Sequence, residues 1–291
     1  MPKHISPLRY PGGKSKLYNK IEQLIKLNKI NNGMYVEPYA GGAGVAFGLL
    51  YNKVVDYIII NDYDLSIYAF WHSVLYNTDN FIQLIRETPI TMNEWYRQKN
   101  IQLSKNSLSN NLLLLGFSTF FLNRTNRSGI IKGGVIGGKD QTGNYKLNCR
   151  FNKEKLIKQI EFISTYKKQV ELLNLKAENL ITERLINLPK NSFIFFDPPY
   201  YKKGFGLYTD FYNHENHVDL ERLIHSYINT PYIITYDNVD EINNIYTQYS
   251  KFVFKINYSA STIKQGSEIL IFNDDLLPYT SLNDIKGLFE I

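Results

Sequence analysis

Short apolar segments alternate with amphipathic helical segments along most of this 291-residue chain. The apolar segments have the length of β-strands, and helices between strands provide crossover connections. This rhythm predicts an α/β fold with a mostly parallel, doubly wound sheet, in which ligands bind beyond the carboxyl ends of the strands. The strands that end most conspicuously are expected over 34–37, 57–60 and 192–196, and they lead to Glu37, Asp62 and Asp197.

The middle of the chain departs from this rhythm. Helical patterns that reach residue 122 are followed by a stretch rich in Gly, Asn, Lys and Arg, which predicts loops over 123–150. Strands and helices then alternate again. We therefore expect a core formed by residues 1–76 and 151–291, with an inserted, mainly helical and loop subdomain at 77–150.

Composition narrows the classes of function. Hydrophobic residues make up 44% of the chain, which is enough for a sizeable core. The single cysteine, Cys149, excludes an intrachain disulfide or a cysteine-rich zinc site, and we expect no metal. The most apolar stretch, 112–122, is shorter than the ~20 residues that a membrane helix needs, and no secretory signal is visible, so we expect a cytoplasmic protein without membrane contact. Lys plus Arg exceed Asp plus Glu by 33 − 27 = 6, which suits a polyanionic partner.

The motif Asp197-Pro198-Pro199-Tyr200 follows the apolar strand at 192–196. Prolines stiffen the loop and carry no N–H group, so it offers mainly acceptors, such as the Asp197 carboxylate and the Pro198 carbonyl. An exocyclic amino group on a base offers two donors, and the Tyr200 ring offers a surface for stacking. The motif therefore predicts a pocket for a flipped nucleobase that carries an amino group. The alternative is a proline turn that caps a strand around a buried tyrosine.

A glycine-rich turn, residues 37–44, separates the first strand from the next helix. Asp62 lies 62 − 44 = 18 positions beyond Gly44, which matches the ~20-residue offset of a carboxylate that binds a ribose hydroxyl. A nicotinamide fingerprint that starts at Gly42 would need a third glycine where the chain has Phe47. The turn therefore favours another adenosine-containing cofactor.

The segment 9–15 precedes the first predicted helix. Gly13-Lys14-Ser15 is similar to the end of a P-loop, but Leu8 stands where a P-loop has its first glycine, and no strand precedes the segment. A nucleoside triphosphatase is therefore disfavoured. A cation in the first turn of a helix is slightly unfavourable, so Lys14 suggests an anionic partner. The alternative is that the Lys14 side chain is simply exposed to solvent.

In this order, the motifs resemble those of the Dam-like (D12 class) DNA adenine N6-methyltransferases. The resemblance spans nearly the whole chain. It implies a Rossmann-like S-adenosylmethionine-dependent methyltransferase core, with the inserted subdomain as the DNA-recognition segment. The implied reaction is site-specific methyl transfer to the N6 amino group of an adenine flipped out of double-stranded DNA. The matching segments are 10–14, 37–42, 61–62, 123–126 with 128–129, 197–200 and 266–268.

The resemblance implies three groups of site residues. The catalytic residues are Asp197, Pro198 and Tyr200. The cofactor-binding residues are Tyr10, Gly13, Lys14, Glu37, Tyr39, Gly41, Asp62 and Asp197. The DNA-binding residues are Arg9, Asn123, Arg124, Asn126, Arg127, Ser128 and Lys132.

Two departures limit what the resemblance says about the DNA sequence. Lys132 replaces an arginine that GATC-specific members use on a base, and Arg127 stands where they have an aromatic wedge. GATC recognition therefore does not carry over. Arg9 stands where the family has a basic residue that reaches a guanine, and arginine is the commonest guanine contact.

Several alternatives stay open. An N4-cytosine methyltransferase would favour Ser at position 197, and a methyltransferase acting on RNA or protein would more often have Asn there. A catalytically inactive DNA-binding relative is disfavoured by the intact Asp197, Tyr200 and Asp62. Double-stranded DNA is the expected partner, a cognate restriction endonuclease is a candidate partner within a restriction-modification system, and we expect a monomer.

Overall fold

The computed structural model describes residues 5–9, 14–30, 32–202, 212–259, 263–273, 277 and 279–289. The chain divides into two compact units. The first unit comprises Met1–Gly13 and Asp62–Asn174, and the second comprises Lys14–Asn61 and Leu175–Ile291. The dividing points of these compact units differ from the predicted domain bounds, because residues 1–13, 62–76 and 151–174 belong to the first unit. That residues 77–150 recognise DNA stays a prediction.

The second unit holds a sheet in which its strands follow the order β2-β1-β4-β5-β7-β6. β1 pairs in parallel with β2 and β4, and β4 pairs in parallel with β5. β7 runs antiparallel to both β5 and β6. The predicted α/β class with a mostly parallel sheet is therefore confirmed. The strands are β1 (Gly33–Glu37), β2 (Val55–Asn61), β3 (Val170–Leu173), β4 (Ser192–Phe196), β5 (Tyr232–Asp237), β6 (Ser250–Ser259) and β7 (Ile263–Phe272).

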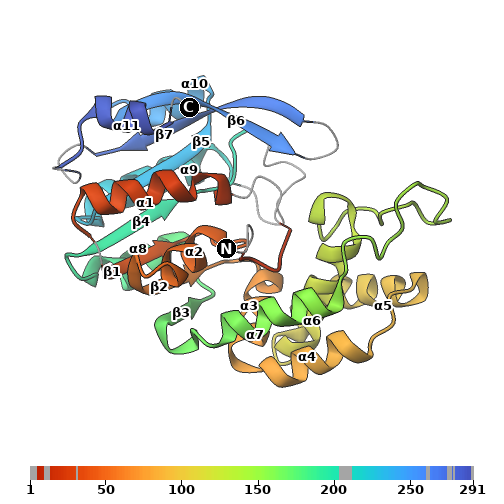
Figure 1. The fold of residues 1–291 in the computed structure, drawn as a ribbon. Helices are drawn as coiled ribbons and strands as arrows, with labels where there is room; N and C mark the ends of the chain where they lie inside the picture. Colours follow the sequence, from red (N-terminus) through yellow and green to blue (C-terminus); the bar gives the residue numbers. More distant parts are fainter. Residues whose placement is uncertain are drawn as a thin grey trace. The chain divides into compact units, whose positions relative to one another are not determined.

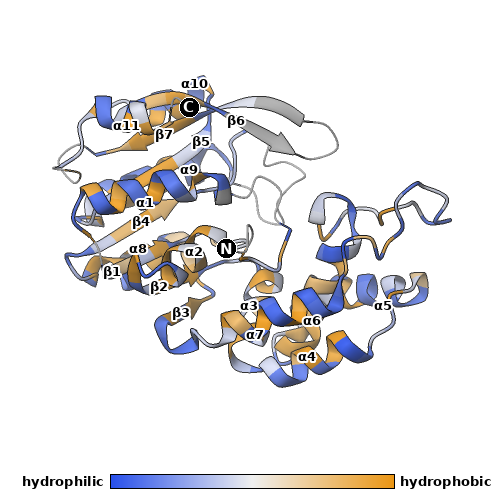
Figure 2. Cartoon of the chain, in the orientation of Figure 1, coloured by the Kyte–Doolittle hydropathy of each residue, from blue (hydrophilic) through white to orange (hydrophobic). Residues whose placement is uncertain are grey.

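Helices of the second unit lie on both faces of this sheet. The chain moves from β1 to β2 in one direction and from β4 to β5 in the other, so right-handed crossovers place α2 and α9 on opposite faces. α1 packs beside α2, and α8 packs beside α9 (Figure 1). Figure 2 shows β4 as apolar and α1 as amphipathic. The helices are η1 (Lys14–Leu17), α1 (Tyr18–Leu27), α2 (Gly44–Tyr51), α8 (Ala177–Glu183), η5 (Leu185–Asn187), α9 (His214–Tyr227), α10 (Asp240–Ile245) and α11 (Leu282–Phe289).

The strand order reverses between β1 and β4, which are neighbours in the sheet although they are far apart in sequence. Their register pairs Val36 with Ile194. Every residue of β4 is buried, which explains its continuous apolar pattern. Glu37 ends β1, and Asp197 follows β4 directly. Both carboxyl groups therefore mark the switch point, where open α/β sheets bind ligands.

The first unit is mainly helical. In its core α3 packs against α6, and the rings of Phe70 and Phe120 stack with centroids 5.9 Å apart. α6 continues to Thr125, so Asn123 and Arg124 lie in a helix and not in the predicted loop. Its elements are α3 (Leu65–Tyr76), α4 (Thr78–Glu87), α5 (Met92–Leu103), η2 (Lys105–Leu108), α6 (Leu112–Thr125), η3 (Arg127–Gly129), α7 (Lys153–Ser164), η4 (Lys167–Gln169) and β3. In the part of the chain that the structure describes, no helix is long and apolar enough to cross a membrane.

The substitution Gly116→Ala should destabilise the first unit. Alanine is the better helix former by about 1 kcal/mol, yet a Cβ at position 116 in α6 would lie 2.4 Å from the carbonyl oxygen of Ala69 and from Oγ of Ser73 in α3. We expect a lower melting temperature in thermal unfolding. Gly287→Ala in α11 is the matched control, because a Cβ there meets nothing within 4 Å. Equal effects of the two substitutions would contradict this view of the α3–α6 contact.

Candidate functional site

Lys14 forms the centre of a buried polar cluster in the second unit. The residue lies in η1 and is 6% exposed. Its Nζ donates to both carboxylate oxygens of Glu268 at 2.8 Å and to the Tyr200 hydroxyl at 3.0 Å, and it lies 3.1 Å from Oδ1 of Asp197. The anionic partners expected for Lys14 are thus carboxylates of the chain itself. Nζ of Lys14 therefore has partners inside the chain, and its predicted contact with a cofactor stays a prediction.

The charges of this cluster are coupled. Burial alone would lower the pKa of Lys14, but the neighbouring carboxylates of Asp197 and Glu268 outweigh burial and raise it. The ammonium therefore stays charged. Glu268 is fully buried, and a buried carboxylate without a paired cation would be strongly destabilising. Among the described residues of this cluster, two carboxylates face one ammonium, which is an excess of one negative charge.

Asp197 presents its two carboxylate oxygens differently. Thr235 Oγ1 donates to Oδ1 at 2.8 Å, and the same oxygen faces Lys14. Oδ2 receives no hydrogen bond from the described residues, and the side chain is 23% exposed. Burial raises the pKa of Asp197 to about 6, although Lys14 opposes this shift. At neutral pH the group is thus mostly ionised, with one oxygen held and the other available to a donor.

Tyr200 is anchored through its hydroxyl. The hydroxyl donates to Oε1 of Glu268, and Lys14 Nζ lies 5.0 Å from the ring centroid. The side chain is 5% exposed, as the alternative reading of a buried tyrosine expected. Pro198 is also buried. The roles of Tyr200 as a stacking surface and of the Pro198 carbonyl as an acceptor stay predictions.

The glycine-rich turn is fixed to the helix that follows it. Oε1 of Glu37 accepts from the main-chain N–H of Ala46 at 3.1 Å and from the Tyr35 hydroxyl at 3.2 Å. Burial raises the pKa of Glu37 to about 8. Gly41 and Ala43 have φ values of +46° and +45°, in the left-handed region that is easiest for glycine. This conformation turns the chain sharply from β1 into α2.

Two further side chains hold the same turn. The Tyr39 hydroxyl lies 3.0 Å from that of Tyr212. The Asn61 amide donates to the carbonyls of Pro38 at 2.9 Å and Leu175 at 3.0 Å. Asn61 thus holds the turn in place from the end of β2. The predicted cofactor-binding residues Tyr10 and Gly13 lie outside the described residues.

Asp62 follows β2 but does not cap the next helix. The residue that caps α3 is Asp64, which accepts from the main-chain N–H of Ser66 at 3.0 Å and pairs with Lys105. Oδ1 of Asp62 accepts from the main-chain N–H of Asp64 at 3.0 Å. The residue that caps α3 is therefore Asp64, and the contact of Asp62 with a ribose stays a prediction.

Two asparagines that were predicted to bind DNA form hydrogen bonds within the first unit. Asn123 is 1% exposed; its amide accepts from the N–H of Arg9 at 2.7 Å and donates to the carbonyls of Arg9 and Gly129 at 2.9 Å. Asn126 is fully buried; its amide accepts from Trp95 Nε1 and donates to two carbonyls of the following loop. These amides have partners inside the chain, so a contact with DNA would compete with these hydrogen bonds, and it stays a prediction.

The other predicted DNA-binding residues remain accessible. Arg127 and Lys132 are exposed, whereas Arg9, Arg124 and Ser128 are half-buried. Ser128 has a φ of +56°, which marks a sharp turn directly after α6. Their contacts with DNA stay predictions.

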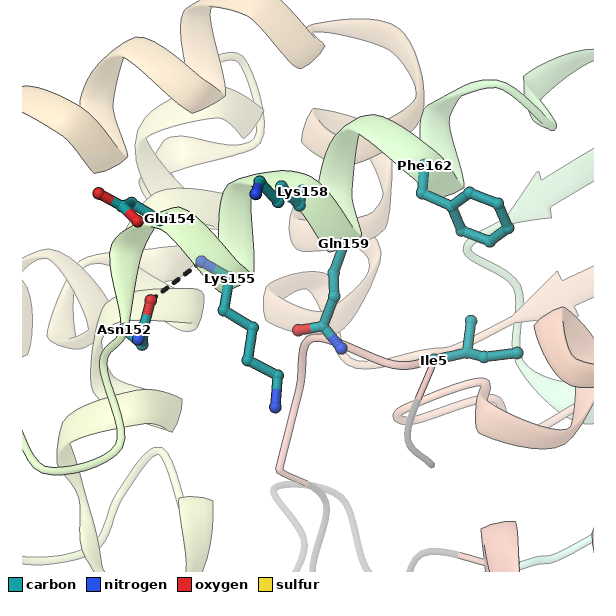
Figure 3. Close-up of a pocket in the computed structure, with 7 residues that line it drawn as sticks. All are labelled: Ile5, Asn152, Glu154, Lys155, Lys158, Gln159 and Phe162. Carbon is teal, nitrogen blue, oxygen red and sulfur yellow. Dashed lines mark hydrogen bonds between the residues drawn. The ribbon is translucent and has the colours of Figure 1, made fainter. Parts of the chain in front are cut away.

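The first unit also has a pocket of about 480 Å³ along α7 (Figure 3). Ile5 and Phe162 lie at one end of it, and Lys155 and Gln159 also line it. None of the predicted catalytic or cofactor residues lines this pocket. Among the residues that the structure describes, no group of three or more His, Cys, Asp or Glu side chains could hold a metal ion.

One family model matches most of the chain. The sequence model of the family described as D12 class N6 adenine-specific DNA methyltransferase matches residues 10–261. The Type II methyltransferase M.MjaIII of Methanocaldococcus jannaschii is 26% identical over 204 residues, which cover 66% of this chain and 68% of that protein. The solved structure of the rRNA methyltransferase aviRa from Streptomyces viridochromogenes is 12% identical, with a TM-score of 0.38, and the match covers 94% of this chain and 90% of that one.

The substitution Glu37→Gln should make the stability of the protein less dependent on pH. The pKa of Glu37 is about 8 in the folded chain, against about 4.3 for an unfolded glutamate. At a pH between these two pKa values, only the unfolded chain releases the proton of Glu37. The contribution of Glu37 to the free energy of unfolding is therefore complete below the pKa of the unfolded chain. It is lost as the pH rises through the pKa of the folded chain, by at most about 1.4 kcal/mol per pH unit. Glutamine still accepts from Ala46 and has no proton to lose.

Thermal unfolding of both proteins between about pH 5 and about pH 8 checks this prediction. The melting temperature of the variant relative to the parent should rise with pH. Glu161→Gln, at a half-exposed surface position, is the control and should show a constant difference. A constant difference for Glu37→Gln as well would contradict the buried, protonated carboxyl.

Proposed function

The chain belongs to the family of D12 class N6 adenine-specific DNA methyltransferases, and from this premise we propose that it transfers a methyl group from S-adenosylmethionine to the N6 amino group of an adenine at a specific site in double-stranded DNA. The observation that carries the proposal is the asymmetry of Asp197. One carboxylate oxygen is held by Lys14 and Thr235, and the other is available to an amino group.

The proposed chemistry depends on acceptors that point at the target amino group. An adenine flipped out of the duplex offers two N–H donors, which Oδ2 of Asp197 and the carbonyl of Pro198 would accept. These hydrogen bonds draw the amino group into one orientation and leave the nitrogen lone pair directed toward the methyl group. The Tyr200 ring, held through its hydroxyl by Glu268, would provide the stacking surface. Positioning and electrostatics then supply most of the rate enhancement.

The residues around the glycine-rich turn fit the proposed cofactor. α2 begins at Gly44, and its N-cap residue Ala43 makes no side-chain hydrogen bond. Glu37 takes the main-chain N–H of Ala46, and the main-chain N–H groups of Gly44 and Val45 would be left for polar atoms of a ligand. The net negative charge of the Lys14 cluster suits a cationic sulfonium. Bound S-adenosylmethionine supplies an electrophilic methyl group. Glu37, Tyr39 and Gly41 would hold it from the turn, and Asp62 would accept from its ribose hydroxyls.

The substitution Asp197→Ala should abolish methyl transfer, because it removes the acceptor for the target amino group. Lys14 keeps Glu268 as a partner, so we expect the fold and cofactor binding to persist. The measurement is transfer of labelled methyl groups into duplex DNA, followed by nucleoside analysis of the product. N6-methyladenine supports the proposal, and N4-methylcytosine would favour the cytosine alternative. Asp219→Ala, at an exposed position of the same unit, is the control. Near-normal turnover of Asp197→Ala would overturn the catalytic assignment.

The substitution Asp62→Ala should weaken cofactor binding without a large loss of stability. A charge-assisted hydrogen bond to a ribose hydroxyl contributes ~1.5–3 kcal/mol, so the dissociation constant should rise roughly tenfold to hundredfold. Asp64→Ala is the matched control: it should lower the stability by about 1 kcal/mol through loss of the α3 cap and leave binding unchanged. Calorimetric titration and thermal unfolding measure both. An unchanged affinity for Asp62→Ala would contradict the ribose contact.

Three other features stay predictions. These are the cytoplasmic location, the monomeric state and the pairing with a cognate restriction endonuclease.

A further inference from the structure

Three arginines that are far apart in sequence meet in the first unit. We call Arg9, Arg124 and Arg150 the arginine cluster. The backbone of Arg9 is held by the Asn123 side chain, and Nη1 of Arg9 donates to the carbonyl of Asn126 at 3.0 Å. Nε of Arg124 donates to the carbonyl of Arg150 at 2.7 Å. The N-terminal segment, the end of α6 and the segment before α7 are thereby tied together at one place.

The arginine cluster has no carboxylate partner in the described part of the chain. Elsewhere, Arg86, Arg97 and Arg222 each lie within 4.0 Å of a carboxylate oxygen. In the cluster the arginines act on one another. Burial and, to a lesser extent, the charges of Arg9 and Arg150 together lower the pKa of Arg124 to about 10. Holding three like charges together costs free energy, and a bound anion would remove that cost.

The cluster also has unused hydrogen-bond donors. Arg124 uses Nε and one N–H of Nη1 on main-chain carbonyls, which leaves the two N–H groups of Nη2. The guanidinium of Arg150 donates to no described residue, and its side chain is exposed. The planar fork of a guanidinium matches two oxygens of a phosphate. Carbonyl anchors hold Arg124 in place before any ligand arrives, so less side-chain entropy is lost on binding.

We propose that the arginine cluster binds a phosphate of the DNA backbone, with Arg124 and Arg150 as its contacts. The proposal rests on the proposed function, because DNA is the ligand. It adds Arg150, which the sequence motifs do not mark, and it assigns Arg124 to the backbone and not to a base edge. The proposal does not involve the predicted contact between Arg9 and a guanine.

Cys149 provides a reporter at this place. It is the only cysteine of the chain, it is exposed, and it directly precedes Arg150. Arg124 is also held against the main chain of Arg150, the residue next to it. A duplex whose phosphate occupies the arginine cluster should therefore shield the thiol from a small neutral reagent.

The first experiment uses the unaltered full chain. The rate of alkylation of Cys149 by N-ethylmaleimide is measured with and without duplex DNA. We expect any duplex to slow the reaction by roughly tenfold or more at low ionic strength, and the protection to fall steeply as salt is added, because a phosphate contact is electrostatic and independent of sequence. An unchanged alkylation rate under conditions where the duplex is bound would overturn the proposal.

The second experiment compares Arg150→Ala with Arg222→Ala, an exposed, ion-paired arginine of the second unit. Arg150→Ala should weaken binding roughly tenfold on all duplexes alike and reduce the salt slope by about 1, whereas Arg222→Ala should bind as the parent does. Weakening confined to one preferred sequence would assign Arg150 to a base and overturn the phosphate contact. If the parent binds and methylates DNA while Arg150→Ala binds equally well, this proposal fails and the proposed function stands; a parent that binds no DNA overturns both.

Discussion

The second unit depends on one buried ammonium group. Glu268 lies in the antiparallel strand β7 with no solvent exposure, and its charge requires a cation at hydrogen-bond distance. Lys14 supplies that cation from the start of the chain and also reaches Asp197 and Tyr200 in the loop after β4. A single side chain therefore ties η1, β4 and β7 together. Without it, two carboxylates would lie in the core with no cation between them.

This ion pair also explains how the Asp197 loop can be both stiff and reactive. A carboxylate that served only the fold would have both oxygens occupied, and one that served only a ligand would be free to rotate. Here Thr235 and Lys14 hold one oxygen of Asp197, and the other remains available. The energetic cost of keeping a partly buried carboxylate ionised is offset by Lys14. Burial still raises the pKa of Asp197 to about 6, so this compensation is incomplete.

The sequence predicts the strands well, because a fully buried strand such as β4 has a continuous apolar pattern and ends at a visible carboxylate. It also places Glu37 and Asp197 at the same edge of the sheet. It does not identify Glu268 as the partner of Lys14, because the two are separated by 254 positions and only the folded sheet brings them together. The position of Lys14 in the first turn of a helix indicates that an anion lies nearby. The sequence does not show that the anion is a carboxylate of the same chain.

Asn123 and Asn126 show a second reason why a sequence motif does not define the contacts of its residues. A short amide side chain offers the same donors and acceptors to a base edge and to a neighbouring main chain. Asn123 and Asn126 satisfy main-chain groups, and Gly129 has no room for a side chain, since a Cβ there would lie 2.1 Å from the carbonyl oxygen of Arg9. These residues therefore fix the backbone around Arg9 before DNA is present. Under the proposed function, this ordered segment would lose less entropy on binding DNA, so more of the free energy of each side-chain contact would appear as affinity. Sequence discrimination would then depend on the longer side chains that this backbone presents.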